Sequence, residues 1–229
     1  AFRPEKCTMP APKSHQPRIL ITAGPTLEHL DPVRAILNRS SGKMGLALAR
    51  ACCQRDIPVQ VLLGPVESAV ERECRSHAQV AAYQTSQDLE DLLDEFWPKN
   101  DVLFMAAAVS DLRPAQVAHS KLPRSAVSIQ LDPVPDLLSG LATRWPSHGI
   151  RIGFALEEES QLIARAKKKL EAKGCHAIAA NPLGTINSDA VSGVWVTREG
   201  HDALGLLSKD QYAAELLNRA LQLCPSLSG

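Results

Sequence analysis

The chain has 229 residues, of which 45% are hydrophobic, and its 25 basic and 25 acidic side chains give a formal net charge of zero. A chain of this length can bury one good core, so we expect a single α/β domain. The balanced charge argues against nucleic acid or an acidic membrane surface as a partner, and no apolar run approaches the roughly 20 residues that span a bilayer.

The N-terminal residues 1–16 are polar and rich in proline, without the apolar centre of a secretory signal. We expect a flexible tail or a cut edge there, followed by one domain over residues 17–225. The six cysteines lack the paired spacing of a metal site. In a chain large enough to fold without disulfides, they indicate packed thiols and a reducing, cytoplasmic location.

Strands and helices are expected to alternate through the first half of the chain, which is the βαβ pattern. Strands are expected at 18–23, 57–63, 79–83, 101–109, 127–131, 150–155, 176–181 and 192–197. Helices are expected at 42–55, 86–97, 134–143, 159–173 and 209–222. Several strands are continuously apolar, which is typical of a parallel sheet covered on both faces. The predicted fold class is therefore α/β: a three-layer Rossmann-like domain whose ligand lies beyond the carboxyl ends of the strands.

A long polar stretch, Gly24–Gly45, separates the first strand from the first helix. Its end, Ser40-Ser41-Gly42-Lys43, suits an anion, because the hydroxyls can cap the helix and glycine lets a ligand approach the backbone. For a lone S-S-G-K, an ordinary helix cap with a solvated lysine would be the better interpretation. The length of the insertion favours a binding site, since a bare connector needs only a few residues.

The next chemically informative segment follows the strand at 101–109. Small apolar residues there would let a flat ring lie against the backbone, and Asp111 follows. An acid at this point can bind a cation or accept from a ribose or base, or it can simply cap a turn. Residues 115–128 are polar and aperiodic, so we expect a mobile flap over the site. By contrast, residues 64–78 need only be a solvated loop or short exposed helix.

Three later features have structural and functional interpretations. Phe154 ends an apolar strand and could be a core side chain or a ring that packs on a base. Lys169 and Lys173 are four residues apart and share a helix face, although a charged helix face is usually only solvated. Asn181 ends the next strand, where asparagine is as often a turn former. Val194–Val196 is expected as an edge strand, and the helix at 209–222 is assigned no chemistry.

Several motifs together resemble phosphopantothenoylcysteine synthetase, the phosphopantothenate–cysteine ligase that forms the C-terminal domain of the bacterial DNA/pantothenate metabolism flavoprotein family. They are AGPT at 23–26, DPVR at 31–34, NRSSGKMG at 38–45, MAAAVSDLRPAQVAHSK at 105–121, GFALE at 153–157, KKKLEAKGCHAIAAN at 167–181 and INSD at 186–189. The resemblance covers roughly residues 17 to 220. The chain departs from the usual K-x-K-K of bacterial members, with Lys121-Leu122-Pro123-Arg124, and has Asn181-Pro182 in place of N-D.

The resemblance implies roles residue by residue. As catalytic residues it implies Asn38, which holds the intermediate, and Lys121, which contacts the triphosphate. For substrate binding it implies Arg34, Asn38 and Asn181. For nucleotide binding it implies Gly24, Ser40, Ser41, Gly42, Lys43, Ala106, Ala107, Ala108, Asp111, Phe154, Lys169 and Lys173.

By the same resemblance, the expected function is an amide ligase of coenzyme A biosynthesis that joins 4′-phosphopantothenate and cysteine through an acyl-cytidylate. CTP, or ATP, would be the co-substrate with Mg²⁺ on its phosphates. A homodimer is implied, and a phosphopantothenoylcysteine decarboxylase can be fused or associated. Two alternatives remain: a catalytically inactive nucleotide-binding subunit, and an NAD(P)-dependent oxidoreductase. The second is disfavoured because the first turn is AGPT rather than G-x-G-x-x-G.

Overall fold

A computed structural model describes residues 16–125, 128–185 and 190–224. Its centre is an eight-stranded sheet in the order β12-β11-β10-β9-β6-β1-β4-β5. The strands are β1 (Ile19–Ala23), β4 (Val59–Leu63), β5 (Gln79–Ala82), β6 (Val102–Met105), β9 (Ile150–Glu157), β10 (Ala177–Pro182), β11 (Ala190–Val196) and β12 (His201–Ser208). The six strands from β5 to β10 are parallel, and β11 and β12 are antiparallel additions. The predicted Rossmann-like α/β fold is therefore confirmed.

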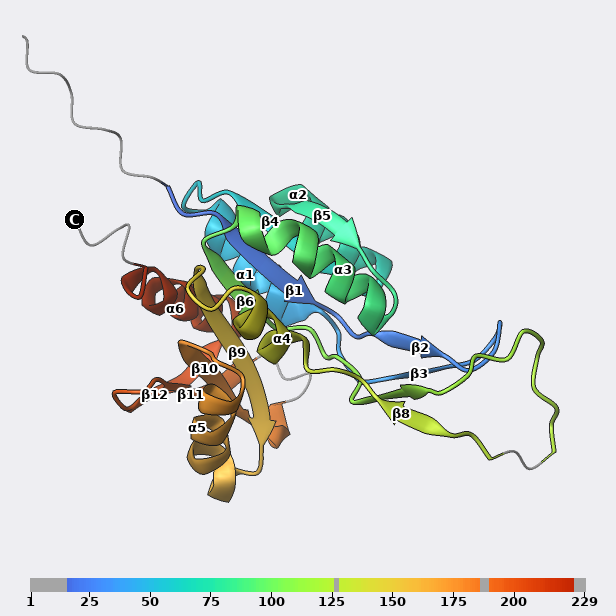
Figure 1. The fold of residues 1–229 in the computed structure, drawn as a ribbon. Helices are drawn as coiled ribbons and strands as arrows, with labels where there is room; N and C mark the ends of the chain where they lie inside the picture. Colours follow the sequence, from blue (N-terminus) through green and yellow to red (C-terminus); the bar gives the residue numbers. More distant parts are fainter. Residues whose placement is uncertain (1–15, 126–127, 186–189, 225–229) are drawn as a thin grey trace, which may run out of the picture.

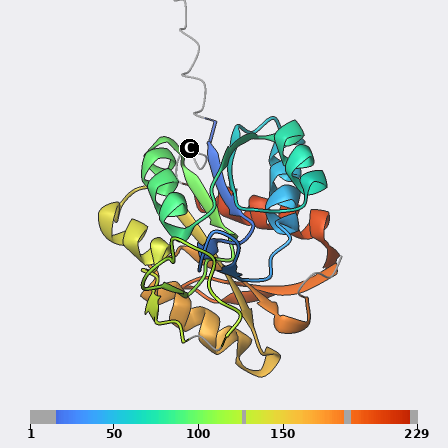
Figure 2. The ribbon, with the colours of Figure 1, turned by 90° about the vertical axis from the view of Figure 1, so that its right-hand side faces the viewer.

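Helices cover both faces of the sheet, as Figures 1 and 2 show. On one face α1 (Lys43–Cys53), α2 (Ser68–His77) and α6 (Lys209–Gln222) bury their apolar sides. On the other lie α3 (Ser86–Phe96), α4 (Leu137–Arg144) and α5 (Leu162–Ala172). Short 3-10 turns occur at Trp97–Lys99, Glu159–Gln161 and Leu183–Thr185. Consecutive residues of β1 are all buried because both faces of the strand meet helices.

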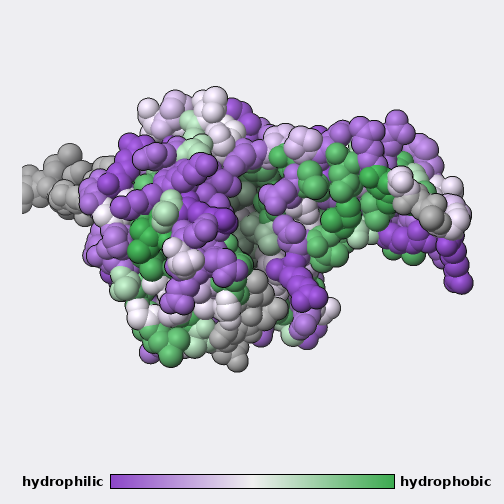
Figure 3. All heavy atoms as spheres, turned by 90° about the horizontal axis from the view of Figure 1, so that it is seen from below, coloured by the Kyte–Doolittle hydropathy of each residue, from purple (hydrophilic) through white to green (hydrophobic). Residues whose placement is uncertain are grey.

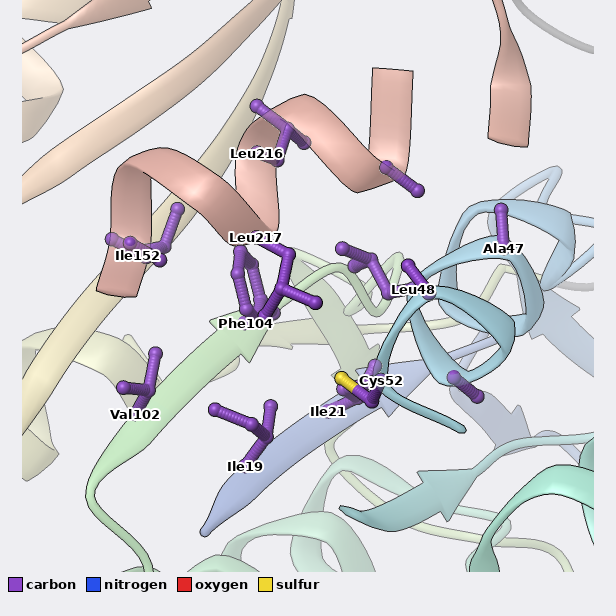
Figure 4. Close-up of a cluster of buried hydrophobic side chains, with 14 of the residues drawn as sticks. Ile19, Ile21, Ala47, Leu48, Cys52, Val102, Phe104, Ile152, Leu216 and Leu217 are labelled. Carbon is purple, nitrogen blue, oxygen red and sulfur yellow. The ribbon is translucent and has the colours of Figure 1, made fainter. Parts of the chain in front are cut away.

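The core divides into two clusters, one on each face of the sheet. Figure 4 shows the first, in which Leu217 of α6 lies over Phe104 of β6 and Leu48 of α1 lies near Ile21 of β1. Each of these four side chains is fully buried. Burial of such side chains contributes about 1.5–3 kcal/mol apiece. Helices α1 and α6 therefore stabilise the positions of β1 and β6, the central strands whose ends carry the candidate site.

A two-hairpin arm projects from the body beyond the carboxyl end of β1 (Figure 1). One hairpin pairs β2 (Leu27–His29) with β3 (Ala35–Leu37), and the other pairs β7 (Leu112–Pro114) with β8 (Leu131–Pro133). We call residues 27–37 and the described part of 112–133 the arm. The two hairpins are joined where the Ala118 amide donates to the Leu30 carbonyl at 3.0 Å.

The structure differs from the sequence-based expectations in several elements. The strand expected at 127–131 is wrong, because the strand there is β8 at 131–133 and pairs within the arm rather than in the main sheet. Val194–Val196 does not form the edge, since β12 pairs beyond β11. The arm hairpins were not anticipated because their three-residue strands are too short to show a period. Residues 1–15, Val127 and the 186–189 motif lie outside the described residues.

Candidate functional site

The candidate site begins where the loop after β1 and the loop after β6 are tied together. The amide of Ala107 donates to the Thr22 hydroxyl at 3.1 Å, and that of Ser110 donates to the Thr26 hydroxyl at 2.9 Å. The Ala108 amide donates to the Gly24 carbonyl at 2.9 Å. Both threonines are fully buried. Nothing in the sequence pattern indicates this role, yet the two threonines hold the Ala106–Ala108 segment in place.

Cavity A is a hollow of about 210 Å³ over the amino end of α1. Its lining residues are Arg39, Ser40, Ser41, Gly42, Lys43, Met44, Gly45, Ala106, Ala107, Ala108, Phe154, Ala155, Leu156, Asn181, Thr185, Val191 and Lys209. The expectation that serine hydroxyls cap α1 is wrong: Gly42 is the N-cap, in the left-handed region with φ 71°, and no side chain caps the helix. The first turn of α1 lines the cavity and its amides have no side-chain cap, which suits an anionic oxygen.

Glycine is required at two positions around the start of α1. Gly42 has positive φ, and a Cβ there would stand 2.8 Å from the Val66 side chain. At Gly45 a Cβ would stand 2.2 Å from the Cβ of Ala23. The absence of side chains thus lets α1 pack directly on the end of β1 and brings its first turn to the carboxyl edge of the sheet.

Cavity B, of about 460 Å³, lies beside cavity A and shares Ala107, Ala108, Phe154 and Leu156 with it. Among its other lining residues are Asn38, Asp111, Asp136, Lys169 and Lys173. The two volumes together lie within the ~300–1,000 Å³ typical of small-ligand sites. The half-buried ring of Phe154 therefore stands between an amide-rich hollow and one that contains two lysines.

Both lysines of cavity B are paired with carboxylates. Lys169 Nζ lies 2.7 Å from Glu157, and Lys173 Nζ lies 3.0 Å from Asp136. Glu157 is also 2.8 Å from Arg165, and its side chain is only 7% exposed. The hydrogen bond from Lys169, joined by that from Arg165, lowers the pKa of Glu157 against the opposing effect of burial. Asp136 thus lines cavity B, and Glu157 holds Lys169 there. Neither acid was predicted as a site residue from the sequence.

Asn38 connects the end of β3 to the loop after β6. Its Nδ2 donates to the Val109 carbonyl at 2.9 Å, which places it near Asp111 on the wall of cavity B. One amide hydrogen is thus engaged. The second hydrogen and Oδ1 take part in no hydrogen bond among the described residues, so they are available to a ligand.

Arg34 and Lys121 lie on the arm and line neither cavity A nor cavity B. The buried Asp31 accepts from the amides of Val33, Arg34 and Leu122 at 2.7, 2.8 and 3.0 Å. The Leu122 amide is the main cause of the lowered pKa of Asp31. Arg34 also donates to the Leu122 carbonyl at 3.1 Å, so it contacts the residue that follows Lys121 in the chain.

The expected site residues therefore fall into two groups. Fourteen of them lie at or beside the two cavities. Gly24 is counted among these because its carbonyl accepts a hydrogen bond from the amide of Ala108, although it lines neither cavity. Arg34 and Lys121 form the second group, on the arm. The described part of the segment expected to be a flap lies along the arm and lines neither cavity. Lys167 and Lys168 are exposed on α5 outside both cavities, unlike Lys169 and Lys173.

A larger hollow, of about 660 Å³, opens at the opposite edge of the sheet, beside the amino ends of β4 and β5. Its three cations, Arg18, Arg75 and Lys99, are each paired with an acid, at 3.8, 2.9 and 3.3 Å. Ligands of open α/β sheets bind beyond the carboxyl ends of the strands. We therefore assign the candidate site to cavities A and B.

No helix in the described parts of the chain is both long and apolar enough to cross a membrane. Among the described cysteines, burial raises the pKa of Cys52 and of Cys175 to about 12, so these thiols stay protonated at neutral pH.

Comparison with known proteins gives consistent matches over most of the chain. The model of the DNA/pantothenate metabolism flavoprotein C-terminal domain matches residues 14–223. The coenzyme A biosynthesis bifunctional protein CoaBC of Haemophilus influenzae is 35% identical over 210 residues, covering 89% of this chain and 51% of that protein. CoaBC of Mycobacterium bovis is 37% identical over 179 residues, covering 73% of this chain and 42% of that protein. The chain thus spans about half the length of these relatives.

Among solved structures, the crystal structure of the C-terminal domain of CoaBC superposes with a TM-score of 0.74 and 31% sequence identity. The match covers 90% of this chain and 95% of that one.

Proposed function

The chain belongs to the DNA/pantothenate metabolism flavoprotein C-terminal domain family, and from that membership we propose that it is a nucleotide-dependent ligase that joins 4′-phosphopantothenate to cysteine in coenzyme A biosynthesis. The observation that carries this proposal is the pair of adjoining cavities around Phe154. One offers uncapped helix amides and Lys43, and the other gathers Asn38, Asp111, Lys169 and Lys173.

In this proposal CTP, or ATP in its place, binds across the two cavities. The base packs on Phe154 and against the Ala106–Ala108 backbone, while phosphates meet the amides of Ser40–Lys43 and the lysines. Glu157 and Asp136 hold Lys169 and Lys173 on the wall of cavity B before the nucleotide arrives. Mg²⁺ would offset phosphate charge, and Asp111 fits its preference for hard oxygen ligands because it forms none of the described ion pairs.

The chemical need explains this arrangement. A free carboxylate resists attack by an amine, so the carboxylate of phosphopantothenate first attacks the α-phosphorus of CTP and displaces pyrophosphate. Cations stabilise the departing charge, and the walls of the cavities keep water from the acyl-cytidylate. The cysteine amine then attacks the acyl carbon, CMP leaves, and the amide forms. Asn38 suits the second step because its remaining N–H can donate to the anionic oxygen of the tetrahedral state.

We propose further that the protein acts as a homodimer in which the arm reaches a second copy. Arg34 and Lys121 both lie on the arm, where Arg34 bonds to Leu122, and both are outside the cavities of their own chain. The arm also exposes the hydrophobic side chains of Val33, Leu37, Leu112, Val117, Ile129 and Leu131. Figure 3 shows a green, hydrophobic band along this projection. Association through this band would cover apolar surface and bring the two cations to the partner's site.

A decarboxylase is the proposed partner in the pathway. The relatives are bifunctional proteins of about twice this chain's length. The next reaction on phosphopantothenoylcysteine is loss of its carboxylate, so a fused or associated decarboxylase would receive the product directly.

The test is to incubate the purified protein with 4′-phosphopantothenate, Mg²⁺ and either CTP or ATP, with and without cysteine, and to measure pyrophosphate and amide product. We expect amide only when cysteine is present, with the preferred nucleotide identified by the faster reaction.

Other outcomes would change the proposal. Pyrophosphate release without amide formation would mean that the carboxylate is activated for a different acceptor. No reaction with either nucleotide, together with a thermal shift on adding CTP or ATP, would indicate an inactive nucleotide-binding subunit. A shift with NAD(P) alone would favour the oxidoreductase.

A further inference from the structure

Cavity A is closed on one side by the C-terminal part of the chain, where three elements meet. Asn181 ends β10, Gly193 lies at the irregular step between Ser192 and Val194 in β11, and Tyr212 is in the first turns of α6. Asn181 lines the cavity, whereas Tyr212 lies behind it and is fully buried.

The hydroxyl of Tyr212 donates to Oδ1 of Asn181 at 2.6 Å. This separation is typical of an O–H···O hydrogen bond and shorter than the usual N–H···O distance. It therefore supports the assignment in which Oδ1 of Asn181, rather than Nδ2, faces the Tyr212 hydroxyl. Burial raises the pKa of Tyr212, so the hydroxyl keeps its proton and remains a donor.

Gly193 leaves room for this hydrogen bond. A Cβ at position 193 would lie 2.2 Å from the Tyr212 oxygen and 2.5 Å from Asn181 Oδ1. The main chain of β11 therefore closes over the pair and restricts other positions of the amide. Oδ1 of Asn181 is thus engaged by Tyr212, whereas its NH₂ group donates to no acceptor among the described residues, on a side chain that lines cavity A.

We propose that Tyr212 is a positioning residue that locks the Asn181 amide so that its NH₂ group donates to an anionic oxygen of the ligand in cavity A. The proposal rests on the proposed function for the identity of that ligand. The oxygen can belong to a nucleotide phosphate or to the pantothenate-derived substrate, since both present anionic oxygen atoms. The amide donor would act beside the uncapped amides of α1 that line the same cavity.

Binding measurements test the coupling. Dissociation constants for CTP–Mg²⁺, ATP–Mg²⁺ and 4′-phosphopantothenate are compared by calorimetry for the wild type, Tyr212→Phe, Asn181→Ala and the double variant. Tyr212→Phe should weaken the ligand that occupies cavity A about threefold to tenfold, as expected for one hydrogen bond. In the Asn181→Ala background the same substitution should have no further effect, because its target is absent.

Leu217→Val is the matched control. Leu217 is fully buried on the same helix as Tyr212, and it lies over Phe104 (Figure 4). The Leu217→Val substitution should lower the melting temperature of the protein without changing any of the three dissociation constants. The proposal is overturned if Tyr212→Phe leaves all three affinities unchanged, or weakens binding equally with and without Asn181.

A second measurement separates this proposal from the ligase assignment. The side-chain NH₂ resonances of Asn181 are recorded by NMR in the protein without ligand. Tyr212→Phe should shift or broaden them, whereas Leu217→Val should not. Unchanged resonances would refute the positioning role. If the resonances respond and Tyr212→Phe weakens binding of one of the compounds, but the wild type forms no amide, the positioning role stands and the proposed function fails.

Discussion

At the scale of single residues, the candidate site depends on groups that are fixed by hydrogen bonds and ion pairs to neighbouring residues. Thr22 and Thr26 hold the Ala106–Ala108 loop, Asn38 is anchored by Val109, and Glu157 holds Lys169. Such anchors restrict the side chains before a ligand binds, which lowers the entropy lost on binding.

Asn38→Asp should separate the two half-reactions. Its carboxylate loses both N–H donors, so it no longer bonds to the Val109 carbonyl or stabilises the tetrahedral oxyanion. We expect pyrophosphate release to persist while amide formation falls about 10²–10³-fold, the cost of removing one oxyanion donor, and acyl-cytidylate to accumulate. Rapid-quench measurement of all three species checks this. Loss of pyrophosphate release together with the product would refute the role given to Asn38.

The pKa of Glu157 predicts a pH dependence of stability. Since hydrogen bonds from Lys169 and Arg165 lower its folded-state pKa, the carboxylate stabilises the fold above the unfolded glutamate pKa of about 4.3. This contribution is lost as pH falls through the folded value. Glu157→Gln should therefore lower the melting temperature at pH 7 and converge with the wild type in acid. Glu171→Gln, at an exposed position on α5, the helix that carries Lys169 and Arg165, should show no such pH-dependent difference.

At the scale of elements, the contact between α1 and β1 places the amide-rich end of the helix at the site. The helix begins only after a long loop, and its amino end is set by close packing on Ala23 rather than by a side-chain cap. The position of cavity A thus depends on a residue that has no side chain.

Gly45→Ala tests this contact. Alanine favours a helix by about 1 kcal/mol, but a Cβ 2.2 Å from that of Ala23 forces α1 outward at a cost of about 1–3 kcal/mol or more. We expect a lower free energy of unfolding in urea and weaker nucleotide binding. Gly200→Ala, whose Cβ would meet nothing within 4 Å, is the matched control and should change neither. Unchanged stability in Gly45→Ala would mean that α1 can shift freely.

At the scale of the whole molecule, the arm separates two expected site residues from the others. Six of the nine large hydrophobic side chains that are exposed among the described residues lie on it. A monomer rarely leaves so much apolar surface on one projection, and this exposure supports the proposed interface between copies.

Leu37→Asp should convert the proposed dimer to a monomer, because a charge would have to be buried in an apolar interface. Sedimentation velocity measures the change. Leu206→Asp provides the control, since Leu206 is 75% exposed but lies on β12 rather than the arm. The interface would be misplaced if the wild type were monomeric at micromolar concentration, or if both substitutions dissociated it equally.

A mixing experiment tests whether the arm completes the partner's site. Lys121→Gln alone should mainly slow pyrophosphate release, and normal release would remove the lysine from the site. When Lys121→Gln and Asn38→Asp chains are exchanged in equal amounts, about one quarter of sites should regain both native residues if the site is shared. Turnover should recover accordingly. If both residues act within one chain, no site regains both.

The alternation of strands and helices, the parallel sheet and the convergence of the loops after β1, β6 and β9 could all be predicted from the sequence. These follow from local apolar runs and from the rule that parallel strands end at one edge. The motifs Ser40–Lys43 and Ala106–Ala108 were found for the same reason: each is continuous in the chain. Even Lys169 and Lys173 follow from helical spacing.

Contacts between residues of distant elements, by contrast, became visible only in the folded molecule. Tyr212 reaches Asn181 from 31 residues away, Thr22 and Thr26 each bond a loop more than 80 residues away, and Glu157 meets a lysine one helix later. No period or spacing encodes such contacts, because they depend on how helices pack on the sheet. The arm was missed for a related reason: its short hairpins are stabilised by contacts such as that of Asp31 with Leu122, rather than by a pattern within either strand.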